Sequence, residues 1–283
     1  MTIDEAIERA AERLREAGVP TPEQDAELLL RHVLGCDRAR LIAEGRSPLP
    51  SEAAGHFDTL VSGRAARRPL QHLVGTQAFW KHEFLVTKDV LIPRPETELV
   101  VEESLRLLLG HDRPFVVDVG TGSGCIALSL AAERPDAEVH AIDISPAALA
   151  VARANADRLA LAGRVLFHEG DLLEPVTALR GRVDLVVSNP PYVDSASRPG
   201  LGPEVRDGDP ALALFPPDEP YSLYRRLAAG ASPLLRPGGG LIVEVGAGMA
   251  TEVERIVGGA GFVVSKVRPD LQGILRVLVA LRS

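Results

Sequence analysis

The chain has 283 residues, of which 46% are hydrophobic and 25% charged, so it is long enough for two packed domains and too apolar to be largely disordered. A formal net charge of −8 argues against a protein that grips nucleic acid, because neutralising phosphates requires a surplus of lysine and arginine. The two cysteines lack metal-ligand spacing, the amino terminus has no basic and apolar leader, and no run of about 18 uncharged apolar residues occurs. These features predict a cytoplasmic protein without disulfides, a metal site or a membrane span.

Three amphipathic helices are predicted at the amino terminus. Start signals at Thr2 and Thr21 each precede apolar residues at helical spacing, and a glycine ends each run. A third helix is expected from Ala53 to Arg67. Residues 1–73 are therefore predicted to form a small all-α domain, whose packing face could be wholly structural or could leave a groove for a partner.

Short apolar groups separated by polar residues follow between Gly75 and Ile92. Phe79-Trp80 and Phe84-Leu85-Val86 are typical of paired strands. We predict a bridging β-hairpin at residues 74–92, which joins the helical domain to a second domain at residues 93–283.

Strand-like apolar runs alternate with helical patterns through the second domain. The expected strands are residues 115–119, 138–142, 165–168, 183–187, 240–245, 262–267 and 275–281. The alternation predicts an α/β domain in which helices cover both faces of a mostly parallel seven-stranded sheet, with ligands at the carboxyl ends of the strands. A long loop at residues 198–220, rich in proline, glycine and acid, is expected beside the strand that ends at Ser188.

A glycine-rich turn follows the first strand of this series. It reads Asp118-Val119-Gly120-Thr121-Gly122-Ser123-Gly124, and its glycines allow the backbone to approach a ligand closely, although an ordinary tight turn has the same composition. The dinucleotide-binding fingerprint requires a glycine where this chain has Cys125, which argues against a nicotinamide cofactor.

Carboxylates follow the next two strands. Asp143 can accept both hydroxyls of a ribose, or can simply cap the following helix. Asp171 can hold an adenine amino group, and Leu172 can pack on the adenine ring. Together with the glycine turn, they predict an adenosine ligand without phosphates, which is S-adenosylmethionine with S-adenosylhomocysteine as the product.

The tetrad Asn189-Pro190-Pro191-Tyr192 directly follows the fourth strand. A planar amide or exocyclic amine is a poor nucleophile, so an enzyme must hold its two N–H groups and present the nitrogen to the methyl group. The side-chain oxygen of Asn189 and the carbonyl of Pro190 can accept those hydrogens, while Tyr192 offers an aromatic face. The tetrad therefore predicts catalysis by positioning, unless it is an ordinary turn.

Three further features extend this pattern: Phe79-Trp80 in the bridge, the segment Ile92-Pro93-Arg94-Pro95-Glu96-Thr97-Glu98, and the helical amino-terminal domain. With them, the chain resembles the release-factor glutamine methyltransferases, the HemK/PrmC family, over nearly its whole length. The resemblance implies a Rossmann-like class I methyltransferase fold. It also implies methylation of the side-chain nitrogen N5 of the glutamine in the Gly-Gly-Gln loop of class I peptide-chain release factors, which the helical domain would dock.

The resemblance also implies roles for individual residues. Gly120 to Gly124, Asp143, Asp171 or its neighbour Leu172, and Asn189 are expected to contact the cofactor, and Asn189 to Tyr192 to hold the substrate glutamine. Arg94 and Glu96 are expected to line the cofactor site, although two such charges in a proline-constrained linker also suit a surface ion pair. The chain departs from the family pattern at Leu214 to Glu219 and at Gly246 to Met249.

Other functions are compatible with parts of this pattern. A ribosomal-protein glutamine methyltransferase would share every catalytic residue. An adenine-N6 DNA methyltransferase could use the same tetrad on a flipped base, but the negative charge and the absence of a basic recognition helix argue against it. A non-enzymatic adaptor would be expected to have a damaged turn or tetrad. Finally, the cluster Arg64, Arg67 and Arg68 could be a solvated face or could steer an acidic partner.

Overall fold

The computed structural model describes residues 1–283, and the chain divides into two compact units. The first unit comprises Met1–Thr76 together with Leu201–Gly208, and the second comprises Gln77–Gly200 and Asp209–Ser283. Part of the long loop predicted at residues 198–220 therefore belongs to the helical unit, which the sequence pattern did not indicate.

The first unit is built from helices around one apolar core. Its helices are α1 (Ile3–Glu16), α2 (Pro22–Leu34), α3 (Arg38–Ala43), α4 (Ser51–Ala65), α5 (Leu70–Val74) and α9 (Pro203–Gly208). Leu14, Leu29 and Leu30 are fully buried between the longer helices, and each such side chain contributes roughly 1.5–3 kcal/mol of hydrophobic stabilisation. The capping box predicted at Thr2 is present, because its hydroxyl accepts from the N–H of Glu5.

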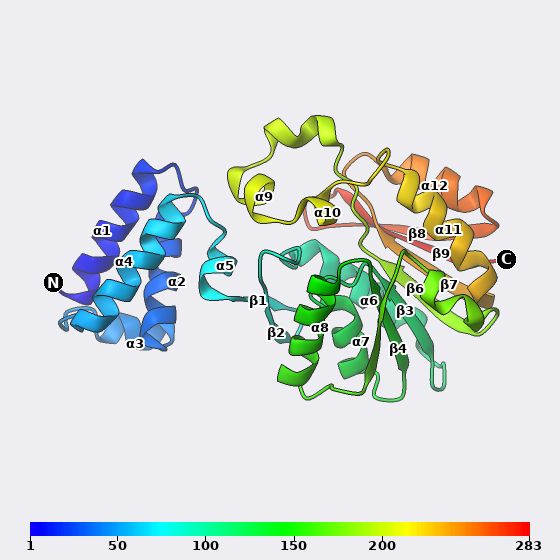
Figure 1. Ribbon diagram of the computed structural model, residues 1–283, viewed down its shortest axis with the longest axis horizontal. Coiled ribbons are helices and arrows are strands. Elements are labelled where there is room, and N and C mark those ends of the chain that lie inside the picture. Colours follow the sequence, from blue (N-terminus) through cyan, green and yellow to red (C-terminus); the bar gives the residue numbers. More distant parts are fainter. The chain divides into compact units, whose positions relative to one another are not determined.

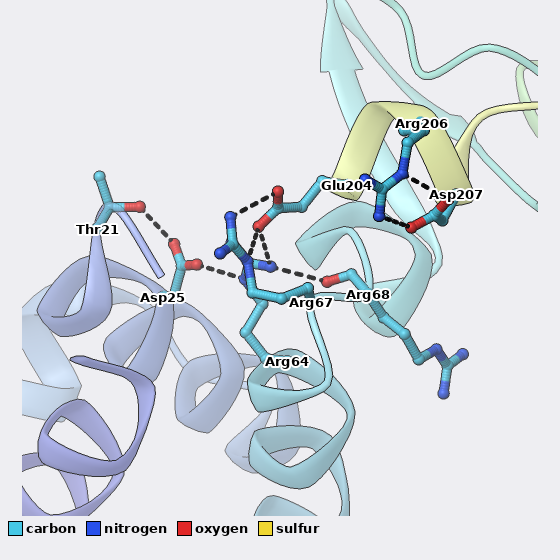
Figure 2. A network of polar contacts seen from close by, with 8 residues as sticks. All are labelled: Thr21, Asp25, Arg64, Arg67, Arg68, Glu204, Arg206 and Asp207. Atoms are coloured by element: carbon cyan, nitrogen blue, oxygen red, sulfur yellow. Dashed lines mark hydrogen bonds and ion pairs between the residues drawn. The ribbon is translucent and has the colours of Figure 1, made fainter. Parts of the chain in front are cut away.

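A cluster of charged side chains holds α9 to the other helices of this unit (Figure 2). The buried guanidinium of Arg64 donates to Asp25 at 2.7 Å and to Glu204 at 2.8 Å. Arg67 donates to the same Glu204 carboxylate through two nitrogens, at 2.7 and 2.9 Å. Arg64 and Arg67 are thus paired within the protein, and only Arg68 of the predicted basic cluster has an exposed side chain.

The second unit contains the predicted mostly parallel seven-stranded sheet (Figure 1). Its strands are β3 (Phe115–Val119), β4 (Glu138–Asp143), β5 (Val165–Glu169), β6 (Val183–Ser188), β7 (Leu235–Glu244), β8 (Phe262–Pro269) and β9 (Leu275–Arg282). They lie in the order β5-β4-β3-β6-β7-β9-β8, and only the pairings of β9 are antiparallel. This arrangement confirms the predicted fold class.

Helices cover both faces of the sheet, as the continuous burial of its central strands requires. The covering helices are α6 (Glu98–Leu107), α7 (Cys125–Glu133), α8 (Pro146–Arg158), α11 (Ser222–Leu234) and α12 (Ala250–Gly259). The second unit also contains the four-residue helix α10 (Ala211–Leu214) and short 3₁₀ turns η1 (Pro95–Thr97), η2 (Glu174–Leu179) and η3 (Ser195–Gly200). Val117 and Val119 of β3 pack in the core that α11 and α12 cover, whereas Val116 packs in the core that α6 and α7 cover. None of these helices combines the length and the apolar character that a membrane-spanning helix requires.

The predicted hairpin consists of β1 (Thr76–Phe79) and β2 (His82–Leu85). Phe79 and Phe84 are fully buried and meet edge to face at 6.0 Å between ring centroids. Both rings join the core beside α6 and α7, so nearly all of the hairpin is part of the second unit. The side chain of Asn155 on α8 fixes the end of β2 by accepting from the N–H of Leu85 at 2.6 Å.

Candidate active site

A cavity of about 490 Å³ opens at the carboxyl ends of the central parallel strands. The chain proceeds from β3 to β4 and β5 on one side and then returns to β6 on the other side of β3. Such a reversal in strand order leaves a crevice where ligands bind in open α/β sheets, and this volume suits a small organic molecule. The predicted motifs after β3, β4, β5 and β6 contribute to its wall.

Most of the glycine turn lines this cavity. Gly120, Thr121, Gly122 and Ser123 contribute to the wall, whereas Gly124 does not. Gly120 and Gly122 have φ angles of 71° and 56°, in the left-handed region that favours glycine, and their unsubstituted sides face open space. The backbone can therefore approach a ligand at these two positions.

Gly124 has a packing role that differs from the role of the turn residues at the cavity wall. It precedes α7 in a left-handed conformation, and a Cβ atom there would lie 2.9 Å from the side chain of Leu128. This glycine permits close packing within the protein rather than contact with a ligand.

Asp118, the fourth residue of β3, supports the turn from behind. Its Oδ2 accepts from the hydroxyl of Thr121 at 2.6 Å and from the N–H of Ala127 at 3.2 Å. Complete burial raises the pKa of Asp118 to about 7, although these hydrogen bonds act in the opposite direction. The sequence pattern alone indicates no role for Asp118.

Asp143 lies at the cavity wall at the end of β4. One carboxylate oxygen accepts from the N–H of Gly122 at 2.8 Å, and the other accepts from the N–H of Ser145 at 2.9 Å. Burial raises the pKa of Asp143. The side chain thus joins the glycine turn to the beginning of α8 and still borders the cavity, so its binding and structural interpretations are compatible.

Asp171 and Leu172 line the cavity after β5. Asp171 is partly exposed and forms an ion pair with Arg226, which also belongs to the wall. Leu172 has a φ angle of 50°, which is uncommon for a residue with a side chain and holds it at the cavity.

The tetrad after β6 is divided between the cavity wall and the protein interior. Asn189 and Pro191 line the cavity, whereas Pro190 and Tyr192 do not. The hydroxyl of Tyr192 points instead to Glu244, the last residue of β7, at 3.2 Å. Gly246 accommodates the tyrosine ring, because a Cβ atom there would lie 2.9 Å from Cδ2 of Tyr192.

Two residues absent from the predicted site hold Asn189 from behind. Its side-chain Nδ2 donates to the hydroxyl of Thr97 at 3.1 Å, and Thr97 in turn donates to Glu244 at 2.6 Å. Complete burial raises the pKa of Glu244 to about 7, against the hydrogen bonds from Thr97 and Tyr192. The available sequence signals were the position of Thr97 within the Ile92 to Glu98 segment and of Glu244 at a strand end.

The predicted pair Arg94 and Glu96 separates in the structure. Arg94 lines the cavity and forms an ion pair with the buried carboxylate of Asp209. Glu96 is half-buried and does not contribute to the wall. The partner of Arg94 therefore comes from the distant loop, and the surface pair between Arg94 and Glu96 is not formed.

The rest of the wall is mainly apolar. It includes Leu212, Ala213, Phe215 and Pro217, all from the region after α9. Phe215 and Pro217 belong to the segment that departs from the family pattern, so this departure lies directly at the site. No group of three histidine, cysteine or acidic side chains could hold a metal ion.

The glycine turn, the carboxylates after β4 and β5, and Asn189 meet at one cavity. Fold and site together define the class of S-adenosylmethionine-dependent methyltransferases. A solved methyltransferase from Pyrococcus furiosus has this fold, with a TM-score of 0.54 and 15% identity, over 78% of this chain and 99% of that one.

Two family models match the chain: the PrmC N-terminal domain at residues 5–75 and the methyltransferase small domain at residues 100–200. A release factor glutamine methyltransferase from Cereibacter sphaeroides is 44% identical over 99% of this chain and 98% of its own length. One from Moorella thermoacetica is 44% identical over 100% and 99%, and one from Deinococcus radiodurans is 42% identical over 100% and 99%. The chain belongs to the release factor glutamine methyltransferase family, and the resemblance found in its sequence is confirmed.

Proposed function

We propose that this enzyme methylates the side-chain nitrogen N5 of the glutamine in the Gly-Gly-Gln loop of class I release factors, in the cytoplasm. The observation that carries the proposal is the placement of Asn189. Its Nδ2 is engaged by Thr97, while no protein group donates to its Oδ1 at the cavity wall. An amide oxygen in this position can accept an N–H of another amide.

The residues around the cavity fit S-adenosylmethionine. Gly120 and Gly122 leave room for the backbone to contact the ligand, and the carboxylate of Asp143 is available for the ribose hydroxyls. Asp171 and Leu172 would hold the adenine. When bound, S-adenosylmethionine supplies an electrophilic methyl group on its sulfonium sulfur.

The protein would contribute positioning and charge stabilisation. Asn189 Oδ1 accepts one N–H of the glutamine amide. The backbone carbonyl of Pro190 is expected to accept the second, although Pro190 does not itself contribute to the cavity wall. These oxygens orient the nitrogen and stabilise the positive charge that develops on it, an effect that is typically worth a factor of about 10² to 10³ in rate for one such contact. The Tyr192 ring lies outside the cavity wall, so we assign Tyr192 to supporting the tetrad through Glu244.

The substrate assignment rests on the relatives and on the shape of the site. The named relatives act on release factors, and this chain matches them over its full length, including the PrmC N-terminal domain. A glutamine between small glycines could enter a cavity that is enclosed by side chains such as Phe215 and Leu212. The helical unit would bind the rest of the release factor.

The two enzymatic alternatives differ in how strongly they compete. A DNA methyltransferase is disfavoured by the net charge of −8. A ribosomal-protein glutamine methyltransferase would use the same tetrad, and the match of residues 5–75 to the PrmC N-terminal domain favours a release factor.

The proposal can be tested with methyl-labelled S-adenosylmethionine and three acceptors: a class I release factor, the same factor with its loop glutamine replaced by alanine, and adenine-containing duplex DNA. We expect label only on the unmodified factor. Asn189→Ala should lower that labelling at least 100-fold while S-adenosylhomocysteine still binds, which shows that the variant is folded. Equal labelling of the factor and its glutamine variant, or labelling of DNA alone, would refute the proposed substrate.

A further inference from the structure

A chain of hydrogen bonds leads from the cavity into the core of the second unit. It begins at Asn189 Nδ2, passes through the hydroxyl of Thr97 at 3.1 Å, and ends on Oε2 of Glu244 at 2.6 Å. The other carboxylate oxygen, Oε1, accepts from Tyr192 at 3.2 Å. Glu244 and Thr97 are each 2% exposed, so water does not compete for these contacts.

The directions of these hydrogen bonds follow from the charge of Glu244. An ionised carboxylate can only accept, so Thr97 must use its single hydroxyl proton to donate to Glu244. The Thr97 oxygen can then only accept, and the group that faces it must be a donor. Asn189 is therefore required to turn its NH₂ toward Thr97 and its Oδ1 toward the cavity.

We infer that Glu244 is a positioning residue, which selects through Thr97 the one orientation of the Asn189 amide that presents an acceptor to the substrate nitrogen. The inference rests on the proposed function only in assigning Asn189 Oδ1 to the substrate N–H. An adenine amine would need the same acceptor, so the inference applies to any planar nitrogen substrate at this tetrad.

The same network fixes the backbone around the carboxylate. Tyr224 of α11 is 1% exposed and donates its hydroxyl to the backbone carbonyl of Glu244 at 2.9 Å. Burial, with Glu244 as a further cause, raises the pKa of Tyr192, so its hydroxyl stays protonated and donates as Thr97 does. Two hydroxyl donors thus converge on one carboxylate whose place in the core is fixed.

Protonation of Glu244 would remove this selection. A neutral carboxyl group can donate to the Thr97 oxygen, which leaves the Thr97 hydroxyl proton free to donate to Asn189. The Asn189 amide could then rotate by half a turn and direct its Oδ1 toward Thr97. Burial raises the pKa of Glu244 to about 7, so this change falls near neutral pH.

The titratable and charged groups that act on Glu244 are Tyr192, Tyr224, Cys125, Glu96 and Arg276. The hydrogen bond from Tyr192 and the charge of Arg276 favour the ionised form, and Arg276 is shared with Asp270.

The direction of the pH effect follows from these roles. Because the ionised carboxylate is the selecting form, methyl transfer should decline as the pH falls through about 7. A glutamine at position 244 keeps the shape of the side chain but cannot titrate, so it separates the charge from the packing.

The test compares Glu244→Gln, Thr97→Val and Thr97→Ser with the wild-type enzyme, using the release factor as acceptor. We expect kcat to fall at least tenfold in Glu244→Gln and Thr97→Val at pH 8, with little change in KM for S-adenosylmethionine. Thr97→Ser keeps the hydroxyl and should stay within about threefold of wild type. The decline of wild-type kcat below about pH 7 should be absent in Glu244→Gln.

The controls separate three different failures. If the wild-type enzyme labels DNA instead of the factor, the substrate proposal fails, but the same variants can still be compared on DNA. If Glu244→Gln keeps wild-type kcat and the same pH profile, the positioning role is refuted. It is also refuted if the variants lose activity only in proportion to lost S-adenosylhomocysteine binding, because that result indicates a purely structural role.

Discussion

Each unit of this protein contains a carboxylate whose pKa is shifted, Glu204 in the helical unit and Glu244 in the second unit, and the two pKa values are shifted in opposite directions. In the helical unit, Glu204 faces the guanidinium groups of Arg64 and Arg67. Burial alone would raise its pKa, but these partners outweigh burial and lower the pKa to about 2. In the second unit, Glu244 receives only hydroxyl donors, and burial raises its pKa to about 7.

This difference in pKa indicates a structural role for Glu204 and a functional role for Glu244. A carboxylate that meets guanidinium groups stays charged under all physiological conditions, so it can join α9 to α4 permanently. A carboxylate that meets neutral donors keeps its charge at a cost, and its protonation can change near neutral pH. Such groups are concentrated at functional sites, where the second unit has its cavity.

The largest expected effect comes from breaking the ionic cluster. Arg64→Met leaves the buried carboxylate of Asp25 without its guanidinium partner, and we expect a loss of about 3–5 kcal/mol in the unfolding free energy of the helical unit. Urea unfolding monitored by hydrogen exchange in α2 and α4 measures this loss.

Arg13→Met is the matched control, because the Arg13–Asp58 pair has the same chemistry with side chains that are 46% and 75% exposed. It should cost at most about 1 kcal/mol. Similar losses in the two variants would contradict the distinction between the buried cluster and a surface pair.

A smaller effect is expected when a neutral donor is removed from Glu244. Thr97→Val deletes the hydroxyl that donates at 2.6 Å, and it should destabilise the second unit by about 1–3 kcal/mol near neutral pH. Thr177→Val, at an exposed hydroxyl, should change stability by less than about 0.5 kcal/mol. Thermal unfolding with S-adenosylhomocysteine absent is the measurement, and equal shifts in both variants would argue against a special role for Thr97.

The two carboxylates should also give pH dependences of opposite sign. Because the folded-state pKa of Glu204 lies below its ordinary value of 4.5, its contribution to stability is present above pH 4.5 and is lost as the pH falls toward about 2. Because the pKa of Glu244 is raised, its ionisation removes stability as the pH rises from 4.5 to about 7. Replacing each by glutamine should abolish the corresponding slope in urea unfolding, and slopes of the same sign would overturn the comparison.

The smallest effect is expected at the rim of the cavity. Arg226 pairs with Asp171 where both side chains are more than a third exposed, so Arg226→Met should change stability by less than about 1 kcal/mol. Calorimetric titration with S-adenosylmethionine should show weaker binding for Asp171→Asn than for Arg226→Met, because the carboxylate rather than the ion pair meets the adenine. The reverse order would remove Asp171 from the proposed cofactor site.

The fold was predictable because its signals are local. The buried runs that became β3 and β6 are bounded by the glycine turn and the tetrad, and alternation with helical patterns indicated a parallel sheet. The short helices α3, α5 and α10 carry little periodic signal and were not predicted. The inclusion of Leu201–Gly208 in the helical unit depends on contacts such as that of Glu204 with Arg64, 140 residues apart.

The position of the cavity was predictable from the sequence, but only some of the predicted site residues line it. Gly120 and Asn189 directly follow strands and Asp143 is the last residue of one, so all three lie where parallel strands end, and all three line the cavity. The support of Asn189 was missed because it depends on the register between β6 and β7 and on a contact of Thr97 with Glu244 across 147 residues. Neither a strand register nor the direction of a side chain such as Tyr192 follows from a pattern of apolar residues.

Fragmentation mass spectrometry of the methylated release factor tests whether Asn189 presents an acceptor to a glutamine amide. We expect one added methyl group on the side-chain nitrogen of the loop glutamine, formed by the wild-type enzyme and absent with Asn189→Ala. A methyl group on any other residue of the factor, or on the loop glutamine with Asn189→Ala at the wild-type rate, would contradict it.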